Sequence, residues 1–302
     1  MQEKRYGWGA KAIFAWNIAI FGVLASAAIF TLGAVAAQNA MRPPRLPVAL
    51  ACPCFSHMHC ESVAITAKDG VVLKGWFYAP DEPTGRTIIL LHGIGSNRQD
   101  MVALGYLFLR HGYSVLEPDL RGHGESGGLA TYGVLDADDI HRWVDLMVKN
   151  GNSLNLYGFG ASLGASVLLE SLKQESRFHA IVAESPYYDF PSIAEERIAR
   201  LLPTGLKWVT IPFVASGIAW VNWHEGINLH DASAANGMRS TTTPVFLIHG
   251  LQDDKTSPDN SRRLASIRRA QLWLVPGSHH ADAWRTVPAE FEERVTAWFS
   301  TF

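Results

Sequence analysis

The sequence has few charged residues and almost no net charge. Charged side chains make up 18% of its 302 residues, and 26 Lys and Arg nearly balance 28 Asp and Glu. Because soluble domains usually contain about a quarter charged residues, this deficit indicates that part of the chain lies outside water. The near balance of the two signs favours neither a nucleic-acid partner nor an acidic tail.

The sequence also lacks internal repeats and the polar composition of disordered chains. No segment recurs at a period of about 20 to 50 residues, which excludes solenoids and propellers. Hydrophobic residues make up 48% and aromatic residues 11% of the chain, enough to form a core. Behind the N-terminal segment, roughly 240 residues remain for one large α/β domain.

Charge is absent from residues 12–41, which are apolar up to residue 37 except for Asn17, Ser26 and Thr31. A helix of about 20 apolar residues crosses a membrane, so we expect residues 1–41 to form a cytoplasmic stub and a transmembrane anchor. A cleaved signal peptide is the alternative, because the triplet at 34–36, Ala-Val-Ala, resembles a cleavage site. Signal peptides usually have shorter apolar regions.

Basic residues flank this span unequally. Lys4, Arg5 and Lys11 precede it, whereas Arg42 and Arg45 follow it. Basic residues concentrate on the cytoplasmic side of membrane spans. We therefore expect the amino terminus in the cytoplasm and the bulk of the chain on the extracytoplasmic side.

Residues 42–60 predict a linker rich in proline and cysteine. Pro43, Pro44 and Pro47 prevent the helix from continuing. All three cysteines of the chain follow, together with two histidines: Cys52, Cys54, Cys60, His57 and His59. One local disulfide with a spare thiol, three reduced cysteines and a small zinc site all remain open, although nothing farther along completes a familiar zinc spacing.

Residues 61–302 predict an α/β domain with a mostly parallel central sheet. ESVAIT and VVLKGWFYAP flank the turn pair Asp69-Gly70 and predict an antiparallel hairpin. Short apolar runs then alternate with segments of helical period, as expected for buried parallel strands with crossover helices. The runs are TIILLHG, YSVLEPD, SLNLYGFG, AIVAES, PVFLIHG and LWLVPG, and the helical segments lie near 98–110, 133–149, 163–174, 257–268 and 287–299.

Residues 186–243 break this alternation. The interval is longer than a usual crossover, and no residue from Trp208 to Val221 is charged. We expect a helical cap here. It would be either a helix pair packed on the domain or a lid that supplies an apolar substrate pocket or dips into the membrane surface.

The pentapeptide Gly-x-Ser-x-Gly occurs twice, around Ser126 and around Ser162. A nucleophile elbow needs a strand that runs directly into the motif and a helix that leaves it. Ser162 follows the apolar run LNLYGFG and precedes a helical period, whereas Ser126 lies between two loop segments. The context therefore favours Ser162 as a nucleophile.

A serine nucleophile needs a base and an acid to orient that base. In this architecture the acid and then the base follow the serine, each after a late strand. HGLQDD offers Asp253 and Asp254, and PGSHHAD offers His279 and His280. Glu184, at the end of AIVAES, is a further candidate for the acid.

Backbone N–H groups can stabilise the oxyanion that forms during acyl transfer. Leu163, directly after the candidate nucleophile, and Ile94, in the loop LLHGIGSN, are the expected donors. Four further polar residues are interpreted as groups that brace neighbouring loops: His92, Asp119, Arg121 and His123.

Taken together, five motifs resemble those of the α/β-hydrolase superfamily: LLHGIGSNRQDM, DLRGHGESGG, GASLGAS, HGLQDD and PGSHHAD. The likeness extends over about residues 60–302 and is greatest to membrane-anchored bacterial hydrolases of the serine-aminopeptidase-like type and to eukaryotic α/β-hydrolase-domain proteins. It implies an α/β-hydrolase fold with a short helical cap. It also implies roles for five residues: Ser162 as nucleophile, Asp253 as acid, His280 as base, and Ile94 and Leu163 as oxyanion-hole donors. One extra residue before Pro258, and His279 where glycine is common, keep Asp254 and His279 open as alternatives.

The resemblance implies a serine hydrolase that needs no cofactor or metal. We expect it to cleave a carboxylic ester or thioester with an acyl or other hydrophobic group through an acyl-enzyme. A serine peptidase of the same mechanism is one alternative, because the fold hosts both activities. A non-catalytic, membrane-tethered binding protein is another. The expected partners are a small-molecule or acylated substrate and a membrane, and not a nucleic acid.

Overall fold

An eight-stranded, mostly parallel sheet forms the centre of the domain. The computed structural model describes residues 6–49, 51–52, 58–149, 151, 155–268 and 270–302. The strand order is β1-β2-β4-β3-β5-β6-β7-β8. β1 and β2 form the predicted antiparallel hairpin, β2 pairs antiparallel with β4, and the remaining neighbours are parallel. The strands are β1 (Met58–Thr66), β2 (Val72–Pro80), β3 (Arg86–Leu91), β4 (Ser114–Pro118), β5 (Asn155–Ala161), β6 (Phe178–Glu184), β7 (Val245–Gly250) and β8 (Gln271–Val275).

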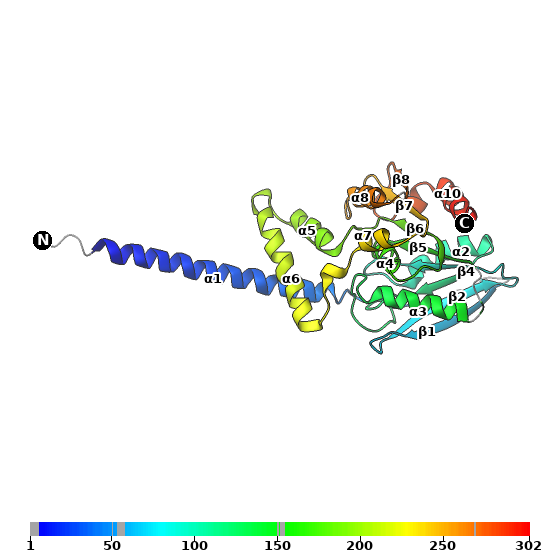
Figure 1. The fold of residues 1–302 in the computed structure, drawn as a ribbon, viewed down its shortest axis with the longest axis horizontal. Helices are drawn as coiled ribbons and strands as arrows, with labels where there is room; N and C mark the ends of the chain where they lie inside the picture. The colour runs from blue at the N-terminus through cyan, green and yellow to red at the C-terminus, as the bar shows by residue number, and fades with distance from the viewer. Residues whose placement is uncertain (1–5, 50, 53–57, 150, 152–154, 269) are drawn as a thin grey trace.

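Helices cover both faces of this sheet (Figure 1). One core lies between the sheet and α3 (Asp136–Lys149), α4 (Leu163–Ser171), α7 (Ala234–Ser240) and α8 (Asp259–Ile267). The other lies between the sheet and α2 (Val102–Arg110), α9 (Ala283–Thr286) and α10 (Pro288–Ser300), with the 3-10 turn η1 (Arg98–Met101) before α2. Because both faces are covered, the parallel strands are mostly buried and mostly apolar, which explains why short apolar runs predicted them.

Two cap helices follow β6 and lie beside the N-terminal helix. α5 (Phe190–Leu201) and α6 (Thr210–Glu225) are joined by the 3-10 turn η2 (Thr204–Val209), and η3 (Leu229–Asp231) leads on to α7. The side chain of Asp189 accepts a hydrogen bond from the Ser192 N–H and begins α5, and Gly226 ends α6 in a left-handed conformation. The expected cap is therefore a helix pair, while α7 packs against α4 of the main domain.

Helix α1 (Tyr6–Ala40) projects from the domain, and only its C-terminal end packs against it (Figure 1). The segment from Lys11 to Ala40 is long and apolar enough to cross a membrane. Large side chains along it are exposed, for example Phe14 and Phe21, whereas Gly33 and Ala34 are buried. The buried end is the part that meets the cap.

The backbones of α1 and α6 touch where two glycines meet. A Cβ atom on Gly33 would lie 2.6 Å from the backbone O of Phe213, and one on Gly217 would lie 2.8 Å from the backbone O of Gly33. Trp220 of α6 donates a hydrogen bond of 3.0 Å from Nε1 to Oε1 of Gln38. Small residues permit this close approach of two helices, so α1 is an integral part of the cap.

The expected linker is also bound to the domain. Arg45 donates hydrogen bonds of 2.8 and 3.0 Å to the backbone O atoms of Ser126 and Gly128, and Asn97 Nδ2 donates one of 3.1 Å to the backbone O of Leu46. An extended, proline-rich segment leaves its carbonyl groups free to accept such bonds.

The cysteine cluster contains one disulfide in the described part of the chain, between Cys52 and Cys60. Cys54 and His57 lie outside the described residues. The disulfide ties the residues before β1 to that strand.

Candidate active site

Ser162 lies at the tight turn between β5 and α4. Its backbone has φ 55° and ψ −114°, a conformation that L-residues rarely adopt and that costs about 1–3 kcal/mol. A Cβ atom on Gly160 would lie 2.6 Å from the backbone N of Ala165, and one on Gly164 would lie 2.7 Å from the backbone O of His92. The motif therefore needs both glycines, and the turn presents the Ser162 side chain at the carboxyl edge of the sheet.

His280 joins Ser162 to Asp253 through two hydrogen bonds. His280 Nδ1 lies 2.7 Å from Asp253 Oδ2, and Nε2 lies 2.7 Å from Ser162 Oγ. A carboxylate can only accept, so Nδ1 carries the proton and Nε2 accepts from the serine hydroxyl. Asp253 follows β7, and His280 follows β8, so three parallel strands place the three side chains at one edge.

Asp253 is buried and strongly hydrogen-bonded. Its Oδ1 accepts bonds of 2.9 Å from the backbone N–H groups of Lys255 and Thr256, and its Oδ2 lies 3.1 Å from Nε2 of His249. Burial alone would raise the pKa of Asp253, but the bonds from His249 and His280 hold it well below its usual range. Asp253 is therefore ionised at neutral pH and can stabilise a protonated His280.

The loop that carries His280 is held by the end of β6. Ala281 N–H donates 3.1 Å to Oγ of Ser185, and Ala283 N–H donates 2.8 Å to Oε1 of Glu184. Burial raises the pKa of Glu184 to about 7. Glu184 thus supports the His280 loop without lying in the hydrogen-bonded chain. Sequence reasoning missed Ser185 and the contact of His249 with Asp253, because only the fold brings them there.

The alternative residues lie apart from the chain of hydrogen bonds. Asp254 and His279 are exposed. Ser126 is buried elsewhere, where its Oγ donates 2.7 Å to the backbone O of Asp119 and accepts 2.9 Å from the Lys74 N–H. The structure thus brings Ser162, Asp253 and His280 together and leaves these three outside.

Ile94 lines the same two cavities as Ser162, and Leu163 directly follows Ser162 in the chain. Leu163 begins α4, where the first N–H groups have no partner within the helix. Within the described ranges, neither of the N–H groups of Ile94 and Leu163 donates to a protein acceptor.

The four residues interpreted as loop braces do hold loops together. His92 Nε2 accepts 3.1 Å from the Leu120 N–H, and His123 Nδ1 lies 3.0 Å from the backbone O of Arg121. Asp119 accepts 2.8 Å from the backbone N–H of Arg98, and Arg121 pairs with Asp139 at 2.6 Å. Burial lowers the pKa of His92 to about 3, so this imidazole stays neutral.

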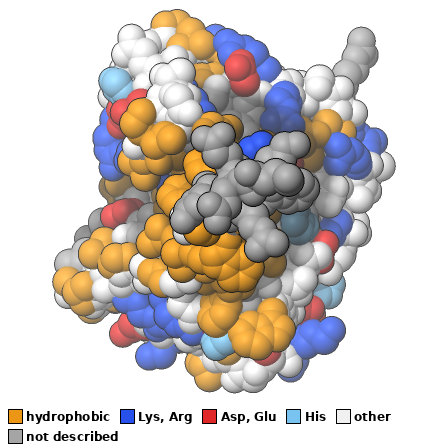
Figure 2. All heavy atoms as spheres, turned by 90° about the vertical axis from the view of Figure 1, so that its left-hand side faces the viewer, with side chains coloured by type: hydrophobic (Ala, Val, Ile, Leu, Met, Phe, Trp, Pro, Cys, Tyr) orange, Lys and Arg blue, Asp and Glu red, His pale blue; other side chains and the backbone are white. Residues whose placement is uncertain are grey.

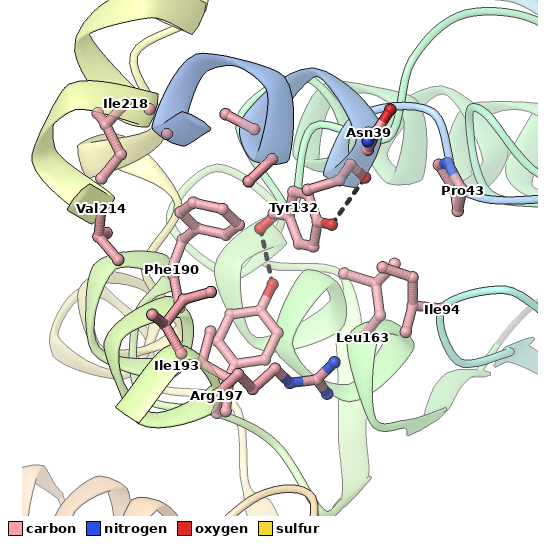
Figure 3. A pocket seen from close by; sticks show the side chains of 18 of the residues that line it. Asn39, Pro43, Ile94, Tyr132, Leu163, Phe190, Ile193, Arg197, Val214 and Ile218 are labelled. Carbon is pink, nitrogen blue, oxygen red and sulfur yellow. Dashed lines mark hydrogen bonds between the residues drawn. The ribbon is translucent and has the colours of Figure 1, made fainter. Parts of the chain in front are cut away.

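An apolar cavity of about 450 Å³ opens at Ser162. Figure 3 shows its walls: Phe190 and Ile193 from α5, Val214 and Ile218 from α6, and the last turns of α1 above them. Five residues of α1 line it: Gly33, Ala36, Ala37, Asn39 and Ala40. Tyr132 OH donates 2.8 Å to the backbone O of Ala40 and holds this wall in place. The N-terminal helix is thus one side of the cavity next to Ser162.

A second, more polar cavity of about 400 Å³ also reaches Ser162 and His280. Its charged lining residues come from five parts of the chain: Asp100, Glu184, Arg197, Lys255 and Arg285. The two cavities share Ile94, Ser162 and Arg197. Ser162 is therefore reached by one largely apolar cavity and by a second cavity that carries charged side chains.

Comparison with known proteins finds a matching family model, similar sequences and similar structures. A family model described as serine aminopeptidase, S33, matches residues 82–217, which include Ser162 and end before Asp253. The uncharacterized protein YqkD of Bacillus subtilis is 28% identical over 233 residues, 75% of each chain. Lysophosphatidylserine lipase ABHD12 of Xenopus tropicalis is 25% identical over 182 residues, 57% of this chain and 43% of that protein. The structure of esterase Pf2001 of Pyrococcus furiosus covers 87% of this chain and 98% of its own, with 27% identity and a TM-score of 0.69.

The raised pKa of Glu184 predicts a pH-dependent stability. Because its pKa rises from 4.5 to about 7 on folding, the stability that the neutral carboxyl contributes is complete below pH 4.5 and is lost as the pH rises through 7. Gln can still accept from Ala283 but does not ionise. We compare the free energy of unfolding of Glu184→Gln with that of the unmodified chain. We expect the difference in favour of the variant to be about 2 kcal/mol larger at pH 8 than at pH 5.

Urea unfolding at the two pH values measures this difference. Glu61→Gln, at an exposed position of β1, controls for the loss of one carboxylate. An equal effect of Glu184→Gln at both pH values would show that the carboxyl is ionised in the folded chain throughout this range.

Proposed function

Since the chain belongs to the α/β-hydrolase superfamily, we propose that it is a membrane-anchored serine hydrolase that cleaves carboxylic esters or thioesters with a hydrophobic acyl group. The observation that carries the proposal is the hydrogen-bonded chain from Ser162 through His280 to Asp253. It ends at a strained serine beside two free N–H groups and an apolar cavity. This is the arrangement that nucleophilic acyl transfer requires.

In the proposed mechanism, Ser162 Oγ attacks the substrate carbonyl carbon while its proton passes to His280 Nε2. Asp253 stabilises the imidazolium that results, and the N–H groups of Ile94 and Leu163 donate to the oxyanion. His280 then gives the proton to the departing alcohol or thiol, which leaves an acyl group on Ser162. Water attacks this acyl-enzyme by the same route and releases the carboxylic acid. Neither a cofactor nor a metal takes part.

The apolar cavity supports a hydrophobic acyl group. Its walls are aliphatic and aromatic side chains of α1, α5 and α6, and burial of an alkyl chain against them stabilises binding by about 0.8 kcal/mol for each CH₂ group. Two of the similar proteins, an esterase and a lysophosphatidylserine lipase, agree with this substrate class.

The charges near Ser162 favour an ester over an aminoacyl amide. An aminopeptidase must hold the ammonium group of its substrate close to the bond it cleaves, which needs carboxylates. The polar cavity has two carboxyl groups but three cations, Arg197, Lys255 and Arg285, so its net charge repels an ammonium group. We therefore place the esterase ahead of the peptidase.

The length of the free part of α1 supports a membrane anchor. Residues 12–28 carry no charge and precede the first hydrogen bond with α6, which Ser216 makes to the backbone O of Ile29. At 1.5 Å for each residue they span about 26 Å, close to the roughly 30 Å of a bilayer core. Figure 2, which views the molecule along α1, shows hydrophobic side chains around the grey residues at the centre and most charged side chains toward the edge. We infer that the cap beside α1, where Trp208 of η2 and Trp223 of α6 are exposed, lies on the membrane surface.

The contacts of α1 argue against a cleaved signal peptide. Cleavage after Ala36 would cut the helix where it packs on α6 and would remove Gly33 and Ala36 from the cavity wall.

The excess of basic residues before the span supports a cytoplasmic amino terminus. The Cys52–Cys60 disulfide supports an extracytoplasmic domain, because disulfides persist in oxidising compartments.

The proposed nucleophile predicts covalent labelling by a fluorophosphonate. We expect one adduct, on Ser162, in the purified full-length chain, because His280 activates this hydroxyl. Ser162→Ala should abolish the adduct and lower kcat for a decanoyl ester at least about a thousandfold. Ser126→Ala, in the second Gly-x-Ser-x-Gly motif, is the matched control and should keep the label. Peptide mass spectrometry locates it. A folded chain without an adduct would make the binding-protein alternative the better one.

The cavity wall predicts that α1 controls acyl-chain preference. We expect Ala36→Phe to lower the ratio of kcat/KM for decanoyl over acetyl p-nitrophenyl esters about tenfold, because the ring fills space that otherwise holds CH₂ groups. Val35→Phe places the same ring at the preceding position, which is exposed and outside the cavity lining. This variant should keep the ratio. Equal ratios in the two variants would contradict a role for α1 in the acyl site.

The anchor predicts retention of the N-terminal helix in cells. When the chain is expressed in a bacterium, we expect it in carbonate-washed membranes with the peptides of residues 1–41 present. Protease added to spheroplasts should release the hydrolase domain. A soluble chain that begins at Ala37 would instead establish cleavage at the signal-like site.

A further inference from the structure

We propose that the polar cavity beside Ser162 binds an anionic group on the alcohol side of the substrate. The substrate of the proposed hydrolase is then an amphiphile with one acyl chain and a phosphate or carboxylate head. This inference rests on the proposed function, because it assigns the second half of the same site.

The geometry of ester cleavage places the two halves of a substrate on opposite sides of Ser162. When the carbonyl carbon lies at Ser162 Oγ, the acyl chain and the leaving alcohol extend away from it in different directions. The apolar cavity accepts the chain, and the polar cavity, which reaches both Ser162 and His280, then receives the alcohol. His280 must face the leaving oxygen in order to protonate it, which agrees with its place in the polar cavity.

Positive charge predominates in the polar cavity. Arg197 and Lys255 are exposed to it, and neither side chain forms an ion pair or hydrogen bond within the described part of the chain. Arg285 makes only a long contact of 3.6 Å with Asp282 while stacking on Trp284. Among the described residues, Arg197 and Lys255 thus have no carboxylate partner and Arg285 has only this distant one, so positive charge remains available to a ligand.

The two acidic residues of this cavity offset the cations only in part. Asp100 accepts a hydrogen bond from the Ser96 hydroxyl. Burial raises the pKa of Glu184 to about 7, so this group is only partly ionised at neutral pH. The cavity therefore favours an anion and disfavours an ammonium group.

Arg197 occupies the position that links the two cavities. It extends from α5 of the cap toward the side where Ile94 and Leu163 lie, as Figure 3 shows. It lines both spaces. A guanidinium group binds phosphate and carboxylate through paired N–H donors. Arg197 can thus contact an anionic head while the ester lies at Ser162.

A matched set of octanoyl esters tests this assignment. The four esters share a three-carbon head that ends in a hydroxyl (1-octanoylglycerol), a phosphate (its 3-phosphate), a carboxylate (the glycerate ester) or an ammonium group (the 3-amino-1,2-propanediol ester). We measure kcat/KM for each with the full-length chain in a neutral detergent. We expect the phosphate and carboxylate esters to exceed the neutral one about fivefold to tenfold and the ammonium ester to fall below it. The preference should shrink as salt rises from 0.05 to 0.5 M, since ions screen exposed charges.

Variants of the cations identify the residues responsible. Arg197→Gln and Lys255→Gln should each reduce the ratio of anionic to neutral kcat/KM about threefold or more, and Arg197→Glu should raise the ammonium-to-neutral ratio. Arg200→Gln is the matched control, because Arg200 lies one turn along α5, pairs with Glu196 and lines neither cavity. It should leave every ratio unchanged. A ratio measured within one sample does not depend on the folded fraction.

The outcomes separate this inference from the proposed function. Equal kcat/KM for all four esters in a chain that a fluorophosphonate labels at Ser162 would overturn the anionic head while the hydrolase stands. A preference that survives in Arg197→Gln and Lys255→Gln would overturn the assignment to this cavity. Absence of both label and turnover would instead contradict the hydrolase itself. A preference confined to one of the two anionic esters would show whether the cavity binds a phosphate or a carboxylate group.

Discussion

The tight turn at Ser162 is the constraint on which the site depends. β5 and α4 meet there at a residue with φ 55°, and the backbone is so close on both sides that only glycine fits at positions 160 and 164. The turn persists because β5 and α4 are buried and fix its two ends. Since β7 and β8 run in the same direction as β5, the loops after them reach the same edge, and Asp253 and His280 arrive at the serine.

The N-terminal helix is joined to this site by a second close contact. Gly33 and Gly217 let α1 and α6 touch, and the next turns of α1 form a wall of the apolar cavity. A helix that merely tethered the domain would need no such fit. The contact between α1 and α6 instead fixes the position of the cavity relative to α1. With α1 across a bilayer, the cavity would lie at the membrane surface, where acylated molecules are concentrated.

Much of the fold could be predicted from short patterns because the sheet is covered on both faces. Each parallel strand is then a short apolar run that ends in glycine, proline or an acidic residue, and the β1–β2 hairpin has Asp69-Gly70 at its turn. The segment at 42–49 differs from the expected linker, since Arg45 and Asn97 bind it to the domain. Single side chains such as Arg45 and Asn97 belong to no periodic pattern, so the sequence does not predict their hydrogen-bond partners.

The sequence by itself determined the order of strands and helices, the apolar length of α1 and the positions of the candidate nucleophile, acid and base along the chain. These follow from local periodicity and from loops that must end parallel strands at one edge. Only the tertiary structure decided between Asp253 and Asp254 and between His279 and His280 as hydrogen-bonded partners, brought His249 and Ser185 to them, and made α1 a wall of the cavity. Those outcomes depend on distances between segments far apart in the chain, which packing sets and local sequence does not encode.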